Sequence, residues 1–290
     1  IPAQPIAATG LLADALGRAA GEGRLAVWSA NPDEQSVIAG TRTHALLALL
    51  GAIGALLGPA PGMQLAVSSD MLVEGRHFLS TVDPARLGHK ALAVNLSDLA
   101  ACGATPVAFT LALALPRVDE AFLAGLAQGL FDLADAHGIG LVGGDTTAGP
   151  LNLCITVFGE VPPGQALRRD GARAGDALWV SHPPGGGVGD ARLALEAFRG
   201  TLALPGDDFN AVRAAMETPQ PRVALGLALR GVASACADVS DGLLGDLLGV
   251  GLAERGLARE SPRDIVDADA RGDGDPVPLV VAEGREVVSG

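Results

Sequence analysis

The sequence predicts an α/β protein with mixed sheets of α+β character, organised as two domains. Apolar strand-like runs alternate with segments of helical periodicity along most of the chain, and such alternation is typical of α/β folds. The 290 residues suit one large domain or two of ordinary size. Residues 159–175 contain two adjacent prolines, four glycines and three arginines, and they separate two such blocks. We therefore expect an N-terminal domain over residues 1–160 and a C-terminal domain over residues 161–290, whose pattern fades after about residue 258.

The N-terminal elements follow from apolar runs and the residues that end them. The 14 residues of Ala45–Gly58 are predicted to form a buried helix, because about 20 residues are needed to span a bilayer. Met63–Val67 is predicted to be a strand that delivers Ser68, Ser69 and Asp70 at its C-terminal end. The other elements expected here are a helix from Asp83 to Gly103, a strand at Val107–Leu115, a helix from Asp119 to Ala136 that is capped near Gly138, and strands at Ile139–Val142 and Leu151–Phe158.

The C-terminal half gives similar signals up to about residue 258, beyond which no strong helix or strand is predicted; residues 1–63 give only weak signals. The expected elements are a strand at Ala177–Val180, helices at Asp190–Phe198 and Pro219–Arg230, a strand at Ala233–Val239, and a leucine-rich helix after it.

Composition excludes several classes of function. The net charge is −13, so the protein's field repels nucleic acid and anionic membranes, and neither is expected as a partner. The nine aromatic residues include no tyrosine, which disfavours base-stacking surfaces. The three cysteines lie far apart and lack zinc-ligand spacing. We therefore expect reduced thiols and a cytoplasmic location.

Aspartates recur near the ends of predicted strands. Asp70, Asp145 and Asp241 each follow such a strand, beside Ser, Gly or Thr. Asp98 lies on an otherwise apolar helical stretch, and Asp238 precedes Asp241 by three residues. Singly, such residues are ordinary caps or turn residues, and a cap is the favoured interpretation of Asp241 taken alone. Together at one sheet edge, however, these carboxylates would repel one another unless a cation neutralised them. Oxygen ligands suit Mg²⁺, and Mg²⁺ in turn suits a phosphate substrate.

Two basic groups are candidates for contacts to an anion. Arg168 and Arg169 offer guanidinium groups that match phosphate oxygens, although a solvated turn is the favoured interpretation without further context. His77 follows Asp70 by seven residues, and a lone histidine is more often structural than catalytic. Glycines beside Asp145 allow a phosphate to approach the backbone. The chain contains neither a P-loop motif nor a dinucleotide-binding glycine motif.

Six segments in this order resemble the thiamine-monophosphate kinase family, of the aminoimidazole-ribonucleotide-synthetase-like superfamily. The resemblance covers roughly residues 64–250, and NLSDLAA and GGDTT are its most specific parts. The segments are SSDMLVEGRHF (68–78), DPARLGHKALAVNLSDLAACGATP (83–106), GLVGGDTTAGPL (140–151), ALRRDGARAGD (166–176), PQPRVALG (219–226) and DVSDGLLGDL (238–247).

The resemblance implies the two-domain fold of that superfamily and a homodimer joined through the N-terminal domain sheets. It implies ATP-dependent phosphorylation of thiamine monophosphate to thiamine diphosphate, with several Mg²⁺ ions. By position, the metal ligands would be Ser68, Ser69, Asp70, Asp98, Asp145, Asp238 and Asp241. The ATP contacts would be Gly144, Asp145, Arg169 and Ser240, and His77 would contact thiamine monophosphate.

The implied chemistry assigns no catalytic side chain. The nucleophile is a phosphate oxygen whose second pKa is about 6, so it is ionised near neutral pH without a general base. Catalysis would consist of positioning and charge neutralisation around an in-line transfer.

Both ends of the chain depart from the family pattern. The family's GIGDDA-type stretch carries metal-binding aspartates, whereas residues 51–57 here read GAIGALL. A GGEDYEL-type segment and a later aromatic residue, which hold thiamine in the family, are absent from the C-terminal part. Two alternatives therefore stay open: a catalytically impaired remnant that binds Mg-ATP, and another enzyme of the superfamily such as aminoimidazole ribonucleotide synthetase.

Overall fold

A computed structural model of the chain describes residues 25–29, 52–173, 176–181, 188–240, 243, 246 and 278–283. These residues divide into two compact units. The first contains the described residues up to Asn95 together with Pro106–Pro162. The second contains Leu96–Thr105 and the described residues from Pro163 onward. Helix α3 (Pro84–Ala101) contributes residues to both units.

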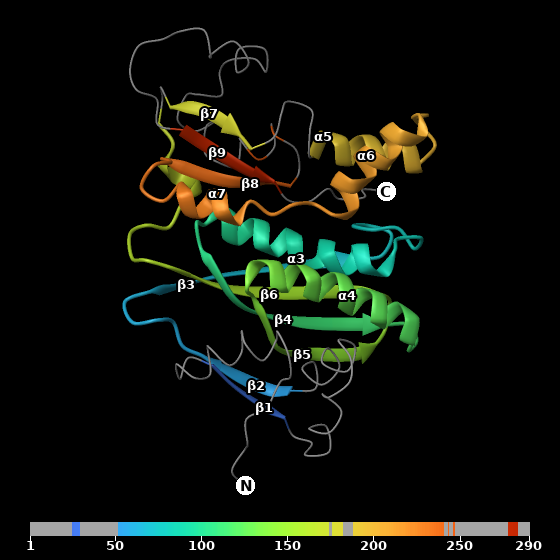
Figure 1. Ribbon diagram of the computed structural model, residues 1–290, viewed down its shortest axis with the longest axis horizontal. Coiled ribbons are helices and arrows are strands. Elements are labelled where there is room, and N and C mark those ends of the chain that lie inside the picture. Colours follow the sequence, from blue (N-terminus) through green and yellow to red (C-terminus); the bar gives the residue numbers. More distant parts are fainter. Residues whose placement is uncertain are drawn as a thin grey trace. The chain divides into compact units, whose positions relative to one another are not determined.

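A four-stranded mixed sheet forms the first unit (Figure 1). Its strands are β3 (Gln64–Val73), β4 (Thr105–Leu115), β5 (Gly140–Ala148) and β6 (Asn152–Val161), in the order β3-β6-β4-β5. β3 and β6 are antiparallel, whereas β4 and β5 are parallel. Two further strands, β1 (Leu25–Ser29) and β2 (Ala52–Leu57), pair antiparallel, and β2 lies beside β5. The mixed α/β class predicted from the sequence is therefore confirmed.

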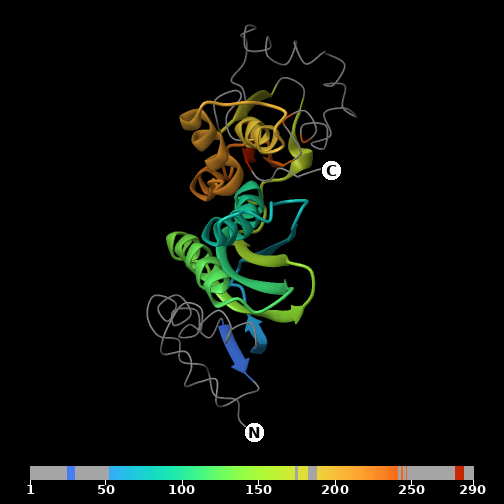
Figure 2. The ribbon, with the colours of Figure 1, turned by 90° about the vertical axis from the view of Figure 1, so that its right-hand side faces the viewer.

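Helices α3 and α4 (Glu120–His137) pack on one face of this sheet (Figures 1 and 2). Glycines bring the two helices unusually close. A Cβ atom at Gly88 would clash with the carbonyl oxygen of Leu126, and one at Gly129 would clash with that of Ala85. Fully buried leucines and Phe109 fill the space between the helices and the sheet: Leu87, Leu92, Leu96, Leu111, Leu126, Leu130 and Leu141.

Helix α4 begins and ends where the sequence predicts. Asp119 has an extended backbone, and its Oδ1 accepts a hydrogen bond from the N–H of Phe122 at 3.1 Å. Gly138 has a φ of 63° in the left-handed region, and its N–H donates to carbonyls of the last turn. An aspartate cap and a glycine that carries no Cβ strain explain why both ends can be predicted from sequence.

A parallel three-stranded sheet forms the centre of the second unit, with β9 between β7 and β8. The elements of this unit are β7 (Ala177–Val180), β8 (Ala235–Val239), β9 (Pro278–Glu283), α5 (Val188–Phe198), α6 (Gly206–Glu217), α7 (Val223–Ala228) and the 3-10 turn η2 (Arg169–Gly171). The rings of Phe198 and Phe209 join α5 to α6, edge to face at 5.1 Å. The Arg213 guanidinium lies 5.6 Å from the centre of the Phe198 ring.

The predicted helix over Ala45–Gly58 is wrong where the structure describes it. Ala52–Leu57 is strand β2, and Leu56 is 67% exposed rather than buried. Residues 45–51 lie outside the described residues. A short apolar run has no period that separates helix from strand, so the pairing with β1 decides the outcome.

Other elements of the second unit were missed or misjudged in length. No helix was predicted over α6, and β9 falls in the region where no strand was expected. Helix α7 is much shorter than the predicted Pro219–Arg230. Of the leucine-rich helix after β8, the structure describes only Leu243 and Asp246, both helical.

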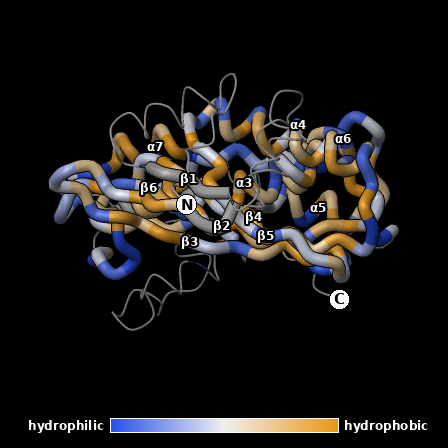
Figure 3. Tube along the Cα trace, turned by 90° about the horizontal axis from the view of Figure 1, so that it is seen from below, coloured by the Kyte–Doolittle hydropathy of each residue, from blue (hydrophilic) through white to orange (hydrophobic). Residues whose placement is uncertain are grey.

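Apolar residues recur along β3 and β6, as the orange stretches of Figure 3 show. Val157 and Ile155 of β6 are buried, while alternate residues of β3 are exposed. None of the helices among the described residues is both long enough and apolar enough to cross a membrane.

Candidate functional site

An acidic pair, of which Asp98 is half-buried and Asp238 buried, lies in the second unit. Asp98 lies in the C-terminal part of α3, and Asp238 lies on β8 with only 7% of its surface exposed. Nη2 of Arg169, in η2, donates to Oδ1 of Asp238 at 3.2 Å. The structure therefore unites three of the residues that the sequence predicts for metal and ATP binding.

The acidic pair disfavours further negative charge. Burial raises the pKa of Asp238 to about 7, Asp98 and Asp246 add to the rise, and Arg169 opposes it. Burial also raises the pKa of the Cys102 thiol, and Asp98 and Asp238 act in the same direction. Like charges and low solvation both penalise ionisation, so a cation bound here would relieve a cost already built into the fold.

Close backbone contacts fix the end of α3 that carries Asp98. Gly103 ends this region with a φ of 63° in the left-handed range. A Cβ atom on Gly226 of α7 would clash with the carbonyl oxygen of Ala100, so α7 packs directly on the helix end. Nε of Arg230 donates to the carbonyl oxygen of Gly103.

The turn that carries Arg169 is held by backbone hydrogen bonds on both sides. The N–H of Leu167 donates to the carbonyl oxygen of Cys102 at 3.1 Å. The N–H of Cys236, in β8, donates to the carbonyl oxygen of Arg168 at 3.1 Å. Arg168 pairs with Asp170 on the surface at 2.6 Å. Of the two neighbouring arginines, it is therefore Arg169 that pairs with Asp238.

The acidic pair matches the donor chemistry of Mg²⁺. This ion is usually held through one or two carboxylates together with waters and substrate phosphates, not by a complete protein cage. Asp98 and Asp238 supply two hard oxygen donors that interact electrostatically. Across the described part of the chain, no group of three or more His, Cys, Asp or Glu side chains is arranged to hold a metal ion. The pair therefore fits an ion that is shared with a phosphate ligand.

The serine-aspartate triplet lies within a strand and not at its end, which corrects the prediction. β3 continues to Val73, so Ser68, Ser69 and Asp70 occupy its middle. Side chains alternate along a strand, so Ser68 and Asp70 share the face of buried Leu72, while Ser69 lies on the opposite, exposed face. A single ion therefore cannot take side-chain ligands from all three residues.

Asp145 also lies within a strand, because β5 extends from Gly140 to Ala148. Asp145 is exposed, and the preceding Gly144 is half-buried. β3 and β5 are the outer strands of the four-stranded sheet, which separates Asp70 from Asp145 by about three strand spacings, roughly 14 Å. The expectation that these aspartates crowd at one sheet edge is therefore wrong for this pair.

Ser240 directly follows β8, and its N–H donates to Oδ2 of Asp246 at 2.7 Å. Asp241 lies outside the described residues. Asp246 was not predicted as a site residue, although it accepts the Ser240 hydrogen bond and raises the pKa of Asp238. The only sign of Asp246 in the sequence is its position: a carboxylate among leucines, shortly after the Asp238–Asp241 segment.

His77 lies in a tight turn between β3 and α3. Gly75 opens the turn with a φ of 77°. Nδ1 of His77 accepts a hydrogen bond from the N–H of Val73 at 2.9 Å, and its carbonyl oxygen accepts one from Nζ of Lys90 at 2.9 Å. Burial lowers the pKa of His77, and the charges of Lys90 and Arg76 lower it further.

The same turn borders a pocket of about 480 Å³. The pocket lies between the turn and the starts of α3 and α4, and its volume is within the usual range for small-molecule sites. It is lined by Glu74, Phe78, Leu79, Ser80, Val82, Pro84, Asp119, Ala121, Phe122 and Leu151.

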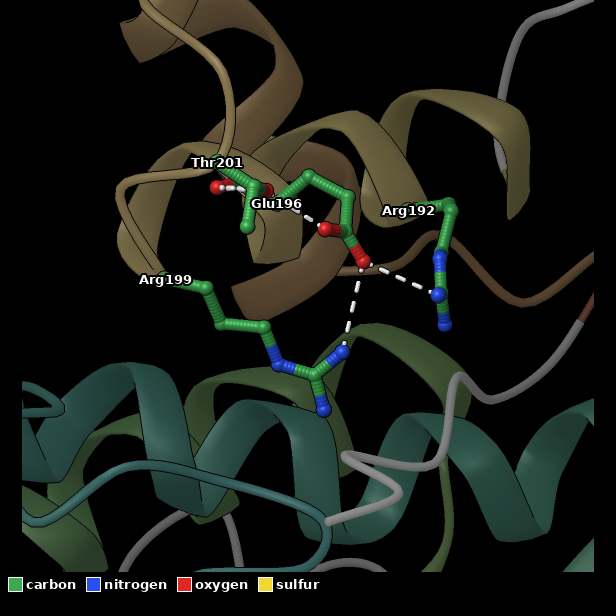
Figure 4. A network of polar contacts seen from close by, with 4 residues as sticks. All are labelled: Arg192, Glu196, Arg199 and Thr201. Atoms are coloured by element: carbon green, nitrogen blue, oxygen red, sulfur yellow. Dashed lines mark hydrogen bonds and ion pairs between the residues drawn. The ribbon is translucent and has the colours of Figure 1, made fainter.

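A second polar network, at the end of α5, has a structural role (Figure 4). Glu196 accepts hydrogen bonds from Thr201 at 2.6 Å and from Arg199 at 3.3 Å, and pairs with Arg192 at 2.9 Å. The Thr201 hydrogen bond is the main reason that the pKa of Glu196 is lowered. The network ties the start of the α5–α6 connection to α5, and every group in it is satisfied by a neighbour.

Comparison with known proteins identifies relatives over both units. The family model described as "AIR synthase related protein, N-terminal domain" matches residues 51–161. The thiamine-monophosphate kinase of Escherichia coli (strain K12) is 47% identical over 193 residues, which cover 67% of this chain and 58% of the relative. That of Salmonella typhimurium is 45% identical over 194 residues, with the same coverage of 67% and 58%. The chain thus spans less than two thirds of the length of these curated relatives.

Solved structures give the same result. The crystal structure of thiamine-monophosphate kinase from Stenotrophomonas maltophilia K279a is 40% identical, with a TM-score of 0.62 over 75% of this chain and 74% of that one. The structure of AaThiL complexed with AMPPCP and TMP is 26% identical, with a TM-score of 0.60 over 68% of this chain and 62% of that one.

Proposed function

Because the chain belongs to the thiamine-monophosphate kinase family, we propose that it transfers a phosphoryl group from ATP to thiamine monophosphate, which forms thiamine diphosphate. The observation that carries the proposal is the likeness to AaThiL, whose structure holds the ATP analogue AMPPCP together with TMP. The acidic pair of Asp98 and Asp238 beside Arg169 supports it, since this combination suits a metal-bound phosphate.

We assign the phosphate end of the reaction to the acidic residues and to Arg169. Asp98 and Asp238 would hold one Mg²⁺ ion, and the separated positions of the other candidates suggest further ions. These remaining ligands would be Ser68, Ser69, Asp70, Asp145 and Asp241. Gly144, Asp145, Arg169 and Ser240 would contact ATP, and His77 would contact thiamine monophosphate, beside the pocket that its turn borders.

The chain's residues would act by positioning and by charge, without a side-chain base. Mg²⁺, when bound, would neutralise and orient the phosphate oxygens. Arg169 would add a fixed guanidinium, held by its ion pair with Asp238. His77 would donate a hydrogen bond from Nε2, because its Nδ1 already accepts one from Val73. The acceptor oxygen is ionised near neutral pH, since the second pKa of a phosphate monoester is about 6.

We also propose that the protein is a cytoplasmic homodimer joined through the N-terminal sheets. β3 is an outer strand of its sheet, and Leu65, Val67 and Met71 form an exposed apolar row along it. An exposed apolar edge strand of this kind is normally covered by a partner.

The direct test is formation of thiamine diphosphate by the purified protein from Mg-ATP and thiamine monophosphate, followed by chromatography. Product above a no-enzyme control supports the kinase. A folded protein that binds Mg-ATP but forms no product would instead be the non-catalytic remnant. Product from aminoimidazole ribonucleotide precursors, and none from thiamine monophosphate, would favour the synthetase.

Asp145→Asn tests the assignment of the exposed β5 carboxylate. We expect it to abolish Mg-dependent nucleotide binding and to lower activity by at least about 100-fold, the usual effect of removing one charge-stabilising group. Asp207→Asn, an exposed aspartate on α6, is the matched control and should retain both. Unchanged Mg-dependent binding in Asp145→Asn, measured by calorimetry, would remove Asp145 from the metal site.

A further inference from the structure

Lys90 is the only lysine in the chain, and it is buried. It lies on α3 with 4% of its surface exposed. A lysine is almost never fully buried unless its ammonium group is paired, because removing the charge from water carries a large penalty. The fold therefore retains a costly residue at this position, and its hydrogen bonds indicate why.

Nζ of Lys90 donates to the carbonyl oxygen of His77 at 2.9 Å. This hydrogen bond crosses from α3 to the turn, 13 residues away in sequence. A charged donor makes a stronger hydrogen bond than a neutral one, and burial strengthens it further by excluding water. The turn is thus held from the helix side by one buried, charge-assisted hydrogen bond.

Two hydrogen bonds with Val73 also fix the His77 ring. The backbone N–H of His77 donates to the carbonyl oxygen of Val73 at 3.0 Å, and the N–H of Val73 donates to Nδ1 of His77 at 2.9 Å. An imidazole nitrogen that accepts a hydrogen bond carries no proton, so the neutral ring bears its proton on Nε2. Burial lowers the pKa of His77, and the charges of Lys90 and Arg76 lower it further, which favours the neutral ring.

We propose that Lys90 is a positioning residue, which holds the Val73–Phe78 turn so that His77 presents Nε2–H to an anionic oxygen of the substrate. The inference rests on the proposed function for the identity of that substrate, thiamine monophosphate. Its structural part, the fixed turn and the Nε2–H tautomer, concerns the ligand-free protein.

The first test is structural and independent of activity. Nuclear magnetic resonance of the five histidines, with His77→Gln to assign the signal, reports the tautomer and the pKa of His77. In the wild type we expect the Nε2–H form and a pKa below the ordinary value. In Lys90→Met, which keeps most of the apolar stem, we expect a mixture of tautomers and a higher pKa. Arg76→Met also removes one positive charge but no hydrogen bond to the turn, so it should raise the pKa while the tautomer stays fixed.

The second test is kinetic. Lys90→Met should raise KM for thiamine monophosphate about tenfold, a change that corresponds to about 1.4 kcal/mol, and should change KM for ATP less than about twofold. Lys90→Arg, which keeps a charged donor, should restore part of the loss, and Lys90→Gln serves if the methionine variant does not fold. A single tautomer and an unchanged KM in folded Lys90→Met would overturn the proposal. A different outcome would separate the two proposals. If the wild type makes no thiamine diphosphate but Lys90→Met still changes the His77 tautomer, the proposed function is contradicted and the role of Lys90 in the turn stands.

Discussion

At the scale of single residues, Asp238 should make the stability of the metal-free protein depend on pH. In the folded state the pKa of the Asp238 carboxyl is about 7, whereas its ordinary value is 3.8. Between these values the folded state binds more protons than the unfolded chain, so stability falls as pH rises. Asp238→Asn removes this fall, and its free energy of unfolding relative to wild type should rise by about 2–4 kcal/mol between pH 4 and pH 8.

Chemical denaturation in a chelator, at pH values from 4 to 8, measures this difference. Asp207→Asn removes the same charge at an exposed position of α6 and serves as the control. Added Mg²⁺ should stabilise the wild type increasingly as pH rises, because the ion competes with the proton for the acidic pair. A constant difference between Asp238→Asn and wild type over this range would show that the pKa of Asp238 is not raised in the folded protein.

The grouping of Asp98, Asp238 and Arg169 illustrates how far residue-level prediction reaches. The motifs alone predicted that these three residues belong to one site, and the structure places the Arg169 guanidinium on Asp238, whose pKa Asp98 raises. It did not reveal that the triplet around Ser69 continues as a strand, because β3 extends three residues past Asp70 through pairing with β6. It also gave no sign that Lys90 would be buried, because a lysine on an amphipathic helix is ordinarily exposed.

At the scale of elements, the close packing of α3 on α4 depends on glycine. Gly129→Ala should lower the free energy of unfolding by about 1–3 kcal/mol, because the new methyl group meets the backbone of Ala85, which cannot move alone. Gly189→Ala in α5 is the matched control, since nothing lies within 4 Å of the added Cβ. The control should be neutral or more stable by up to about 1 kcal/mol, as expected for alanine in a helix. Urea denaturation followed by circular dichroism measures the free energy of unfolding of both variants. Equal values would mean that α3 and α4 can move apart without loss of stability.

The elements also show which signals in a sequence are local. Helix α4 was predicted because its aspartate cap and its left-handed glycine act within the helix itself. Strand β9 was missed because its short run of apolar residues acquires a partner only from β7 and β8. Strand β2 was taken for a helix for the same reason, since pairing with β1 and not periodicity determines its form.

At the scale of the whole molecule, the exposed row on β3 should control assembly. Val67 is 57% exposed in this outer strand, and Leu65 and Met71 lie on the same face. Val67→Asp should halve the mass measured by light scattering at micromolar concentration, because a carboxylate would be buried without a partner in the interface. Val118→Asp, at a position that is 81% exposed outside the sheet, is the control and should keep the dimer mass. If Val67→Asp remains dimeric, the assignment of the dimer interface to this row on β3 is wrong.

The overall class was the most predictable property, and the arrangement of strands the least. Alternating apolar runs were sufficient to indicate an α/β chain, because periodicity reflects burial and not pairing. The order β3-β6-β4-β5 depends on contacts between strands distant in sequence, which no local pattern encodes. For this reason the acidic residues on β3 and β5 were expected to meet at one edge of the sheet, whereas they lie on its two outer strands.

The pairing of β3 with β6 also bears on how the chain is made. Val73 lies opposite Asn152, 79 residues later, and Gln64 lies opposite Val161, 97 residues later. During synthesis β3 therefore leaves the ribosome long before its partner and must wait with its backbone hydrogen bonds unmade. Its apolar row is exposed throughout that interval, when neighbouring nascent chains offer the same surface. The strand that we assign to dimer formation is thus also a segment that can associate with neighbouring nascent chains before the fold is complete.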